Sequence, residues 1–223
     1  MRVRDVMTTD LIMVEPEMPV LEAQDLMREH KVRKLLVVSK GKLVGMLTHD
    51  LFMEVSPSKA TTLSIQELRY LLTALKVKEV MDKNLVTVSP DMAFEDALNL
   101  GKQKGNNGFP VVENGELVGI ITNGDIIRLL SSFLGLGEGG VRLTIEGLGT
   151  RLGELNEIIA IADRHRAPIL SIMTKSGQAT DGLIAVIRLK VEDATAIVED
   201  LNSTGFNVTY VSKPLPSKGA EGD

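Results

Sequence analysis

Residues 3–7, Val-Arg-Asp-Val-Met, recur 74 positions later as residues 77–81, Val-Lys-Glu-Val-Met. Outward from this pair, the correspondence continues without a gap between residues 3–50 and residues 77–124. Sixteen of those 48 aligned positions are identical, whereas average composition gives roughly three by chance. The period is longer than the ~20–50 residues of common repeat arrays, and there are two copies, so the sequence indicates a duplicated domain.

Each copy predicts the same order of elements, β-α-β-β-α. An extended piece ending in proline leads into an amphipathic helix, predicted over residues 20–29 in the first copy and 93–104 in the second. Two short apolar strands joined by a glycine-containing turn follow, and a threonine-bearing turn leads into a closing helix. In the first copy, the capping-box pattern Ser-Ile-Gln-Glu at residues 64–67 predicts the start of a helix.

The sequence changes character after residue 134. Residues 135–140 include four glycines and predict a linker. Residues 141–213 have no counterpart in the repeat and predict a βαββαβ unit, which is a ferredoxin-like α+β fold. Residues 214–223 carry no periodic apolar pattern and predict a flexible tail.

Composition narrows the class of protein. Hydrophobic residues make up 43% and charged residues 25% of the 223 residues, which is typical of globular chains. A net charge of −5 and an aromatic content of 3% argue against nucleic-acid binding. The chain has no cysteine, no apolar N-terminal signal and no run long enough to span a membrane. We therefore expect a cytoplasmic protein with neither nucleic acid nor membrane as a partner.

The two V-x-x-V-M motifs, together with a T-V-x-P-like extended piece and a G-x-x-T turn followed closely by Asp, resemble a tandem CBS-domain pair, or Bateman module. The resemblance implies two CBS domains packed about a pseudo-twofold axis, with limits of 1–75 (including a connecting helix) and 76–134. Residues 60–81, which contain a leucine-rich helical pattern, resemble the acetoin-utilisation (AcuB) family in particular.

The C-terminal unit resembles an ACT domain through Gly147, Leu152 and Leu155, which follow its first predicted strand. This resemblance implies dimerisation or the sensing of a small ligand. The loop predicted over residues 146–151 lacks the Asp and Pro of the D-x-P-G pattern that is frequent in ACT domains. Two interpretations therefore stand side by side: an amino-acid site, and a purely dimerising module that makes the chain a homodimer.

The CBS resemblance implies a regulatory ligand that contains adenosine: AMP, ADP, ATP, NAD or S-adenosylmethionine. In CBS domains, the residues that match Asp125 and Thr122 lie against ribose and phosphate. The competing interpretation is that Asp125 caps a helix and Thr122 is a turn residue. The first copy departs from the pattern, because Thr48 and Asp50 are two residues apart instead of three. Either its helix begins earlier, or this half-site is degraded.

The remaining candidate residues follow from the same resemblance. Arg33 and Lys34 belong to a basic cluster before a strand of the first copy, and we expect them to neutralise phosphate held by the second copy. The alternative is a solvated basic helix end. The other candidate ligand contacts are Asn107 and Asn123, together with a set of strand residues that could as easily be ordinary core: Ile12, Leu35, Val86, Thr87, Phe109 and Pro110.

The sequence contains no catalytic or metal-ligand motif. His30, His49 and His165 lie far apart in the sequence, and neither a P-loop nor a nucleophile-elbow pattern is present. The chain is therefore predicted not to be an enzyme and to require no cofactor. The alternative to a nucleotide sensor is a ligand-free oligomerisation scaffold for a metabolic enzyme partner, with acetoin metabolism implied by the AcuB resemblance.

Overall fold

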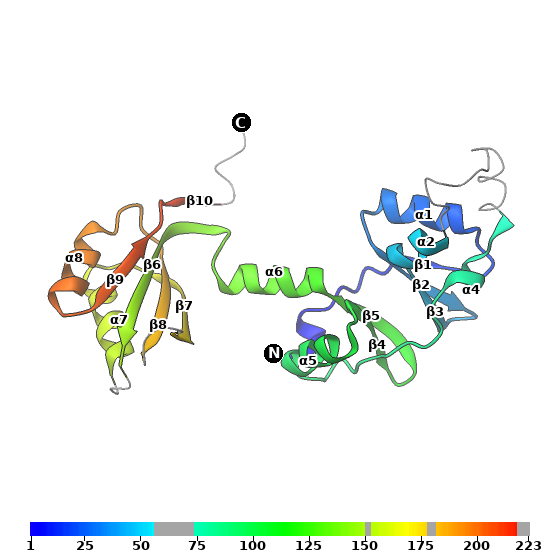
Figure 1. Ribbon diagram of the computed structural model, residues 1–223, viewed down its shortest axis with the longest axis horizontal. Helices are drawn as coiled ribbons and strands as arrows, with labels where there is room; N and C mark the ends of the chain where they lie inside the picture. Colours follow the sequence, from blue (N-terminus) through cyan, green and yellow to red (C-terminus); the bar gives the residue numbers. More distant parts are fainter. Residues whose placement is uncertain (56–73, 150–152, 178–181, 218–223) are drawn as a thin grey trace. The chain divides into compact units, whose positions relative to one another are not determined.

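The computed structural model describes residues 1–55, 74–149, 153–177 and 182–217. The chain forms two compact units, Met1–Ile126 and Ile127–Asp223 (Figure 1). The two sequence copies lie in the first unit. The predicted helix start at residues 64–67 lies outside the described residues, as does most of the segment 60–81.

The first copy shows the predicted β-α-β-β-α order, with a short helical turn in front. The second copy has the same turn and the order α-β-β-α, and an isolated bridge between Val88 and Val111 stands where its first strand was predicted. The elements of the first copy are η1 (Val3–Asp5), β1 (Met13–Val14), α1 (Val20–Glu29), β2 (Lys34–Ser39), β3 (Lys42–Thr48) and α2 (His49–Val55). Those of the second are α4 (Val77–Val80), α5 (Phe94–Lys104), β4 (Gly108–Glu113), β5 (Glu116–Thr122) and α6 (Asn123–Phe133). Helix α2 begins directly after the threonine turn, where the sequence had not marked a helix start.

The V-x-x-V-M motif of each copy pairs with the other copy. The Val3 amide donates to the Met92 carbonyl at 2.9 Å, and the Val77 amide donates to the Met18 carbonyl at 3.0 Å. These two bonds correspond under the 74-residue shift. The same holds for two reciprocal bridges, which join Thr8 to Ile120 and Asp82 to Met46. The predicted pseudo-twofold arrangement is therefore present, and it is made by exchanged N-terminal segments.

Side chains at equivalent positions form the core between the copies. Leu36, Met46 and Ile120 are buried there. The apolar side chains that pack around them come in pairs related by the shift: Leu11 with Leu85, and Leu43 with Leu117. Burial of such aliphatic groups contributes about 25 cal/mol per Å², so the symmetric seam stabilises the pair without aromatic residues.

The exchanged segments give a matched stability prediction. Val3 and Val77 are both fully buried, at 0% exposure. Truncating either to alanine removes two methyl groups from a packed site, and we expect each variant to lose about 2 kcal/mol of unfolding free energy. Urea unfolding followed by circular dichroism measures the loss. If Val3→Ala alone were neutral, the N-terminal segment would not be part of the paired core.

The second unit contains the predicted βαββαβ order. Its elements are β6 (Glu138–Leu148), α7 (Glu154–Arg164), β7 (Ile169–Ser176), β8 (Leu183–Leu189), α8 (Thr195–Ser203), β9 (Asn207–Val211) and β10 (Leu215–Ser217). The strand order is β9-β6-β8-β7 with all neighbours antiparallel, and β10 also pairs with β6. This is an antiparallel sheet with two helices, as expected for a ferredoxin-like fold; its assignment as an ACT domain stays a prediction.

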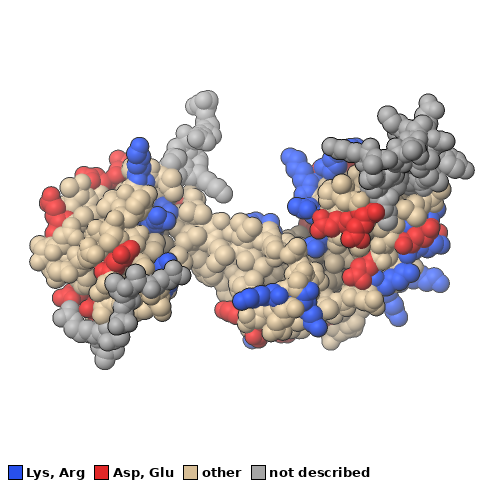
Figure 2. Space-filling view, viewed as in Figure 1, with Lys and Arg blue, Asp and Glu red and all other residues tan. Residues whose placement is uncertain are grey.

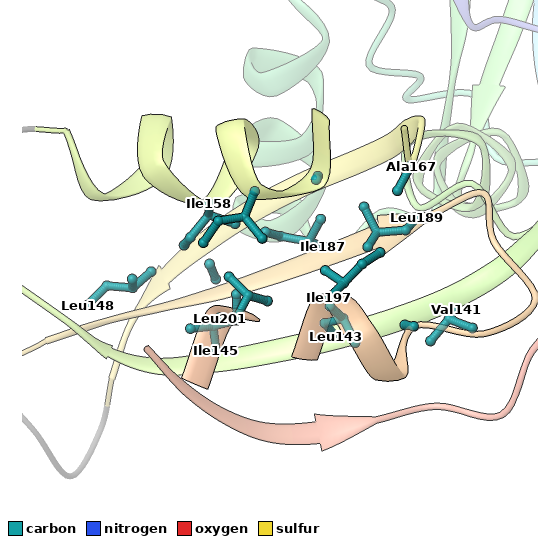
Figure 3. Packing of buried hydrophobic residues seen from close by; sticks show 14 residues of the cluster. Val141, Leu143, Ile145, Leu148, Ile158, Ala167, Ile187, Leu189, Ile197 and Leu201 are labelled. Atoms are coloured by element: carbon teal, nitrogen blue, oxygen red, sulfur yellow. The ribbon is translucent and has the colours of Figure 1, made fainter. Parts of the chain in front are cut away.

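Alternate residues of the strands build the core of this unit against helices α7 and α8. Leu143 and Ile145 of β6 and Ile187 of β8 point toward Ile158 and Leu201 of the helices (Figure 3). The intervening strand residues lie on the opposite face of the sheet, because successive side chains of a strand alternate. One face is therefore filled by aliphatic packing, and the other carries the polar residues Arg142 and Thr144.

Three predicted boundaries shift in this unit. Strand β10 (Leu215–Ser217) pairs with β6 and lies within residues 214–223, which the sequence predicts as a flexible tail. Strand β6 begins at Glu138, so the last three residues of the segment 135–140 are in the sheet. The strand also continues through Leu148, so the first half of the loop predicted over residues 146–151 is strand. Gly147, at φ +73, accommodates an irregularity there, and Leu148 is buried. The sequence-based loop was placed too early because its glycines were taken as breakers.

No described helix of either unit is long and apolar enough to cross a membrane. The face seen in Figure 2 carries basic and acidic side chains interspersed, without a continuous basic surface.

Candidate functional site

The N-terminus of helix α6 brings three polar residues together. The backbone amide and the hydroxyl of Thr122 both donate to Asp125 Oδ2, at 2.7 and 2.6 Å. The Thr8 hydroxyl donates to Asp125 Oδ1 at 2.7 Å. Asp125 is 1% exposed. This carboxylate is thus buried and accepts hydrogen bonds from the exchanged N-terminal segment of the first copy and from the threonine turn of its own copy.

Asp125 therefore caps helix α6 in this conformation. A carboxylate three residues into a helix that binds back to the N-cap amide completes a capping box, which is the geometry of the competing interpretation. Its contact with ribose stays a prediction, and such a contact requires the Thr8 hydroxyl to move away. Sequence reasoning missed Thr8, although it directly follows the V-x-x-V-M motif and Asp82 stands at the same position in the second copy.

A cavity of about 350 Å³ lies beside this corner of the second copy. Such a volume is at the lower end of that of small-molecule sites, ~300–1,000 Å³. Four of the predicted ligand residues line it: Asn107, Phe109, Thr122 and Asn123. The other lining residues are Phe94, Ala97, Leu98, Gly101, Lys102, Gly105, Asn106, Gly108, Ile121 and Ile126. The walls are apolar and polar in nearly equal parts, and the polar part includes amide, hydroxyl and ammonium groups.

The repeat explains why this space exists in the second copy. At the positions of Gly101 and Ile126, the first copy has Met27 and Phe52. Both of these side chains are 4% exposed and belong to the packed core of the first copy. A glycine inside a helix costs about 0.5–1 kcal/mol relative to alanine. At these two positions the second copy thus carries smaller residues than the first, whereas at Phe94 and Phe109 it carries larger ones than the Val20 and Leu35 of the first copy.

The amides at the cavity contact each other. Asn123 Nδ2 donates to Asn107 Oδ1 at 3.3 Å, and the Asn123 backbone amide donates to the Asn107 carbonyl at the same distance. These contacts join the loop before β4 to the start of α6. A planar ligand with donors and acceptors on its edge can exchange with such amide contacts.

Lys34 of the first copy reaches the second copy at this place. Its Cε lies 3.1 Å from where a Cβ of Gly108 would be, so the missing side chain makes room for the lysine. Burial lowers the pKa of the Lys34 ammonium below its ordinary value, and the neighbouring Arg33 charge lowers it further, against the opposing effect of Asp50. Arg33 Nη2 is 3.3 Å from Asp50 Oδ1. An anion at Gly108 would favour the charged form of Lys34.

The first-copy half-site lacks the buried carboxylate. Helices α2 and α6 begin at equivalent positions, which places Leu51 where the second copy has Asp125. Thr48 Oγ1 accepts a hydrogen bond from the Leu51 amide at 3.2 Å, as an N-cap does. The Asp50 side chain is 74% exposed. Thr48 and Asp50 are therefore close in sequence, but they do not form the hydrogen bonds that join Thr122 to Asp125 in the second copy.

The remaining predicted contacts do not line the cavity. Leu35 is fully buried in the core of the first copy, and Ile12 packs against that core. Pro110 is buried, and its carbonyl accepts from the Val88 amide at 3.0 Å, whereas Val86 is half-buried and Thr87 is exposed. Among the described residues, no cluster of His, Asp or Glu could hold a metal ion.

Comparison with known proteins bears on the first unit. The sequence pattern of the CBS domain matches residues 3–57 and 77–132. The CBS domain-containing protein YhcV of Bacillus subtilis is 34% identical over 125 residues, which cover 56% of this chain and 81% of YhcV. No part of the C-terminal unit beyond residue 132 falls within the matched ranges.

Two solved structures are similar to part of this chain. A Vibrio cholerae protein assigned to acetoin utilization (AcuB) superposes with a TM-score of 0.52 at 24% identity, covering 62% of this chain and 96% of that protein. A structure of CBSX2 in complex with AMP covers 58% of this chain and 95% of CBSX2 at 28% identity, with a TM-score of 0.48. The match to YhcV extends over most of that protein, and on that ground this chain belongs to the family of CBS-domain proteins.

Proposed function

We propose that the chain is a non-catalytic regulatory protein that binds an adenosine-containing ligand, such as AMP, ADP, ATP, NAD or S-adenosylmethionine, in the second copy of its CBS pair. The observation that carries the proposal is the cavity of about 350 Å³ whose lining includes Asn107, Phe109, Thr122 and Asn123. It combines an apolar floor with convergent polar groups, which is the usual composition of a small-molecule site.

Each part of the ligand has a candidate partner. The purine lies against Phe94 and Phe109, and the asparagine amides bind its polar edge. Phosphate lies near Gly108, where Lys34 supplies positive charge. A ribose hydroxyl takes the place of the Thr8 hydroxyl on Asp125 and preserves the hydrogen bond to that buried carboxylate.

This placement gives the ligand a way to regulate. Lys34 belongs to the first copy, whereas Thr122 and Asp125 belong to the second, so an occupied site joins the two copies. A ligand shifts the arrangement of a protein only by its difference in affinity between two states. Exchange of the Thr8 hydroxyl for a ribose is such a difference, because it frees the N-terminal segment of the first copy from Asp125.

Calorimetric titration of AMP into the full chain tests the proposal. We expect one ligand per chain, and Lys34→Gln should weaken the affinity about tenfold, since charge-assisted contacts to phosphate contribute about 1.5–3 kcal/mol. Lys42→Gln, which removes an exposed lysine of strand β3, is the matched control and should bind as the wild type does. Two AMP molecules per chain, or equal loss in both variants, would contradict the assignment. If AMP gives no heat, the other four compounds are titrated before the proposal is abandoned.

One observation favours a second candidate function. The hydrogen bonds to Asp125 from Thr8 and Thr122 satisfy this buried carboxylate without any ligand. A CBS pair closed in this way, with an ACT-like unit that dimerises the chain, would be an oligomerisation scaffold for a metabolic enzyme partner, for example in acetoin metabolism. Failure of all five adenosine compounds to bind, together with a stable homodimer by light scattering, would support this scaffold instead.

A further inference from the structure

Two arginines lie directly opposite each other in the sheet of the C-terminal unit. Arg142 of β6 and Arg188 of β8 are register partners. The Cβ atoms of such partners are about 5 Å apart and on the same face of the sheet. Like charges directly opposite each other destabilise a sheet, so this pair is unfavourable unless something negative lies beside it.

Uncharged backbone carbonyl groups bind Arg188, which is the buried arginine of the pair. Arg188 is 4% exposed. Its Nε donates to the Leu134 carbonyl at 2.8 Å, and its Nη1 is 3.5 Å from the Gly139 carbonyl. Burial lowers the pKa of Arg188 from its ordinary value, and the Arg142 charge lowers it further. The carbonyls bind two of its N–H groups, but they cancel no charge.

Arg142 is half-buried and incompletely bonded. Its guanidinium carbon lies 5.0 Å from the centre of the Tyr210 ring, which is a cation–π contact. Its Nε is buried and has no hydrogen-bond partner. Within the described parts of the chain, no aspartate or glutamate forms an ion pair with Arg142 or Arg188. A buried charged group normally has such a partner.

We propose that Arg142 and Arg188 form a binding site for an oxyanion, namely the carboxylate or phosphate group of a small molecule. Guanidinium groups bind both kinds of anion through paired N–H donors. An anion bound by the half-buried Arg142 side chain cancels the repulsion across the strands, and a turn of that side chain toward the anion gives the orphaned Nε an acceptor. Tyr210 is 48% exposed and flanks Arg142, so the anion approaches along this ring. Arg142 contacts the anion, and Arg188 supplies a second positive charge from the interior.

Titration calorimetry on the full chain tests this site, with inorganic phosphate and acetate as separate probes in chloride buffer of constant ionic strength. We expect at least one of them to bind saturably, and Arg142→Gln to weaken that binding at least tenfold. Arg166→Gln removes the same charge from an exposed position of the same unit and should leave the affinity unchanged. Because repulsion is removed, Arg142→Gln should melt no lower than the wild type in the absence of phosphate and acetate.

A second variant covers the case in which Arg142→Gln does not fold. Arg142→Lys keeps the charge but loses the paired donors, and it should weaken binding several-fold. Lys34→Gln should leave the binding intact, which separates this site from the one proposed in the CBS pair. The inference is overturned if neither anion binds saturably, if binding survives both Arg142 variants, or if Lys34→Gln abolishes it.

Discussion

Replacing Asp125 by alanine is expected to lower the free energy of unfolding by about 3 kcal/mol, because it removes a helix cap and the buried acceptor of three hydrogen-bond donors. Those donors are the amide and hydroxyl of Thr122 and the hydroxyl of Thr8. Urea unfolding followed by circular dichroism measures the change. The same truncation in helix α2 of the first copy, Asp50→Ala, removes an exposed carboxylate and should cost less than about 0.5 kcal/mol.

The difference in unfolding free energy between Asp125→Ala and Asp50→Ala measures how much the hydrogen bonds at Asp125 stabilise the protein. If Asp125→Ala cost no more than Asp50→Ala, the buried hydrogen bonds of this corner would contribute little, and Asp125 would be free for a ligand at no loss of stability. A large difference means that a ribose has to reproduce the bond that the Thr8 hydroxyl makes now.

The second large effect is expected at Gly140, at the start of strand β6. The residue has φ +80, a conformation that side chains disfavour. A Cβ added there would overlap the backbone carbonyl of Leu189 in the paired strand. Since neither backbone can move without breaking the ladder, Gly140→Ala should destabilise the C-terminal unit by about 3 kcal/mol or more.

Gly147 provides the control for that prediction. It lies in the same strand at φ +73, but a Cβ there would meet no atom within 4 Å. Gly147→Ala should therefore cost only about 1 kcal/mol, from backbone strain. Amide hydrogen exchange of strands β6 and β8 measures the destabilisation of this unit in both the Gly140→Ala and the Gly147→Ala variants. Equal protection in the two variants would show that the close approach at Leu189 is not rigid.

Much of the fold of the first unit could be predicted, because the sequence of each helix and strand there occurs in two versions, one in each copy. The amphipathic pattern located helix α1 over Val20–Glu29, with the bounds that the structure shows. The start of α2 was missed because Thr48 has no carboxylate three residues later, so the turn gave no capping signal. The start of β6 was missed because glycines that allow close strand approach look like linker residues in the sequence.

The site was harder to predict, because its contacts join residues far apart in the chain. Thr8 and Asp125 are separated by 117 residues, and no local pattern relates a hydroxyl to so distant a carboxylate. The cavity could be predicted only in part, from differences between the aligned copies. Gly101 stands inside a helix where the first copy has a buried methionine, and Ile126 stands where it has a phenylalanine. The loss of volume was therefore visible in the aligned copies.

A crystal structure of the chain with AMP tests the central claim most directly. The account predicts ligand density in the second copy, with the base in the cavity beside Asn107 and Phe109, the phosphate near Lys34, and the Thr8 hydroxyl displaced from Asp125. It predicts no density in the first copy, where Met27 and Phe52 fill the corresponding space. Density in the first copy, or an AMP that leaves the second-copy cavity empty, would contradict the account.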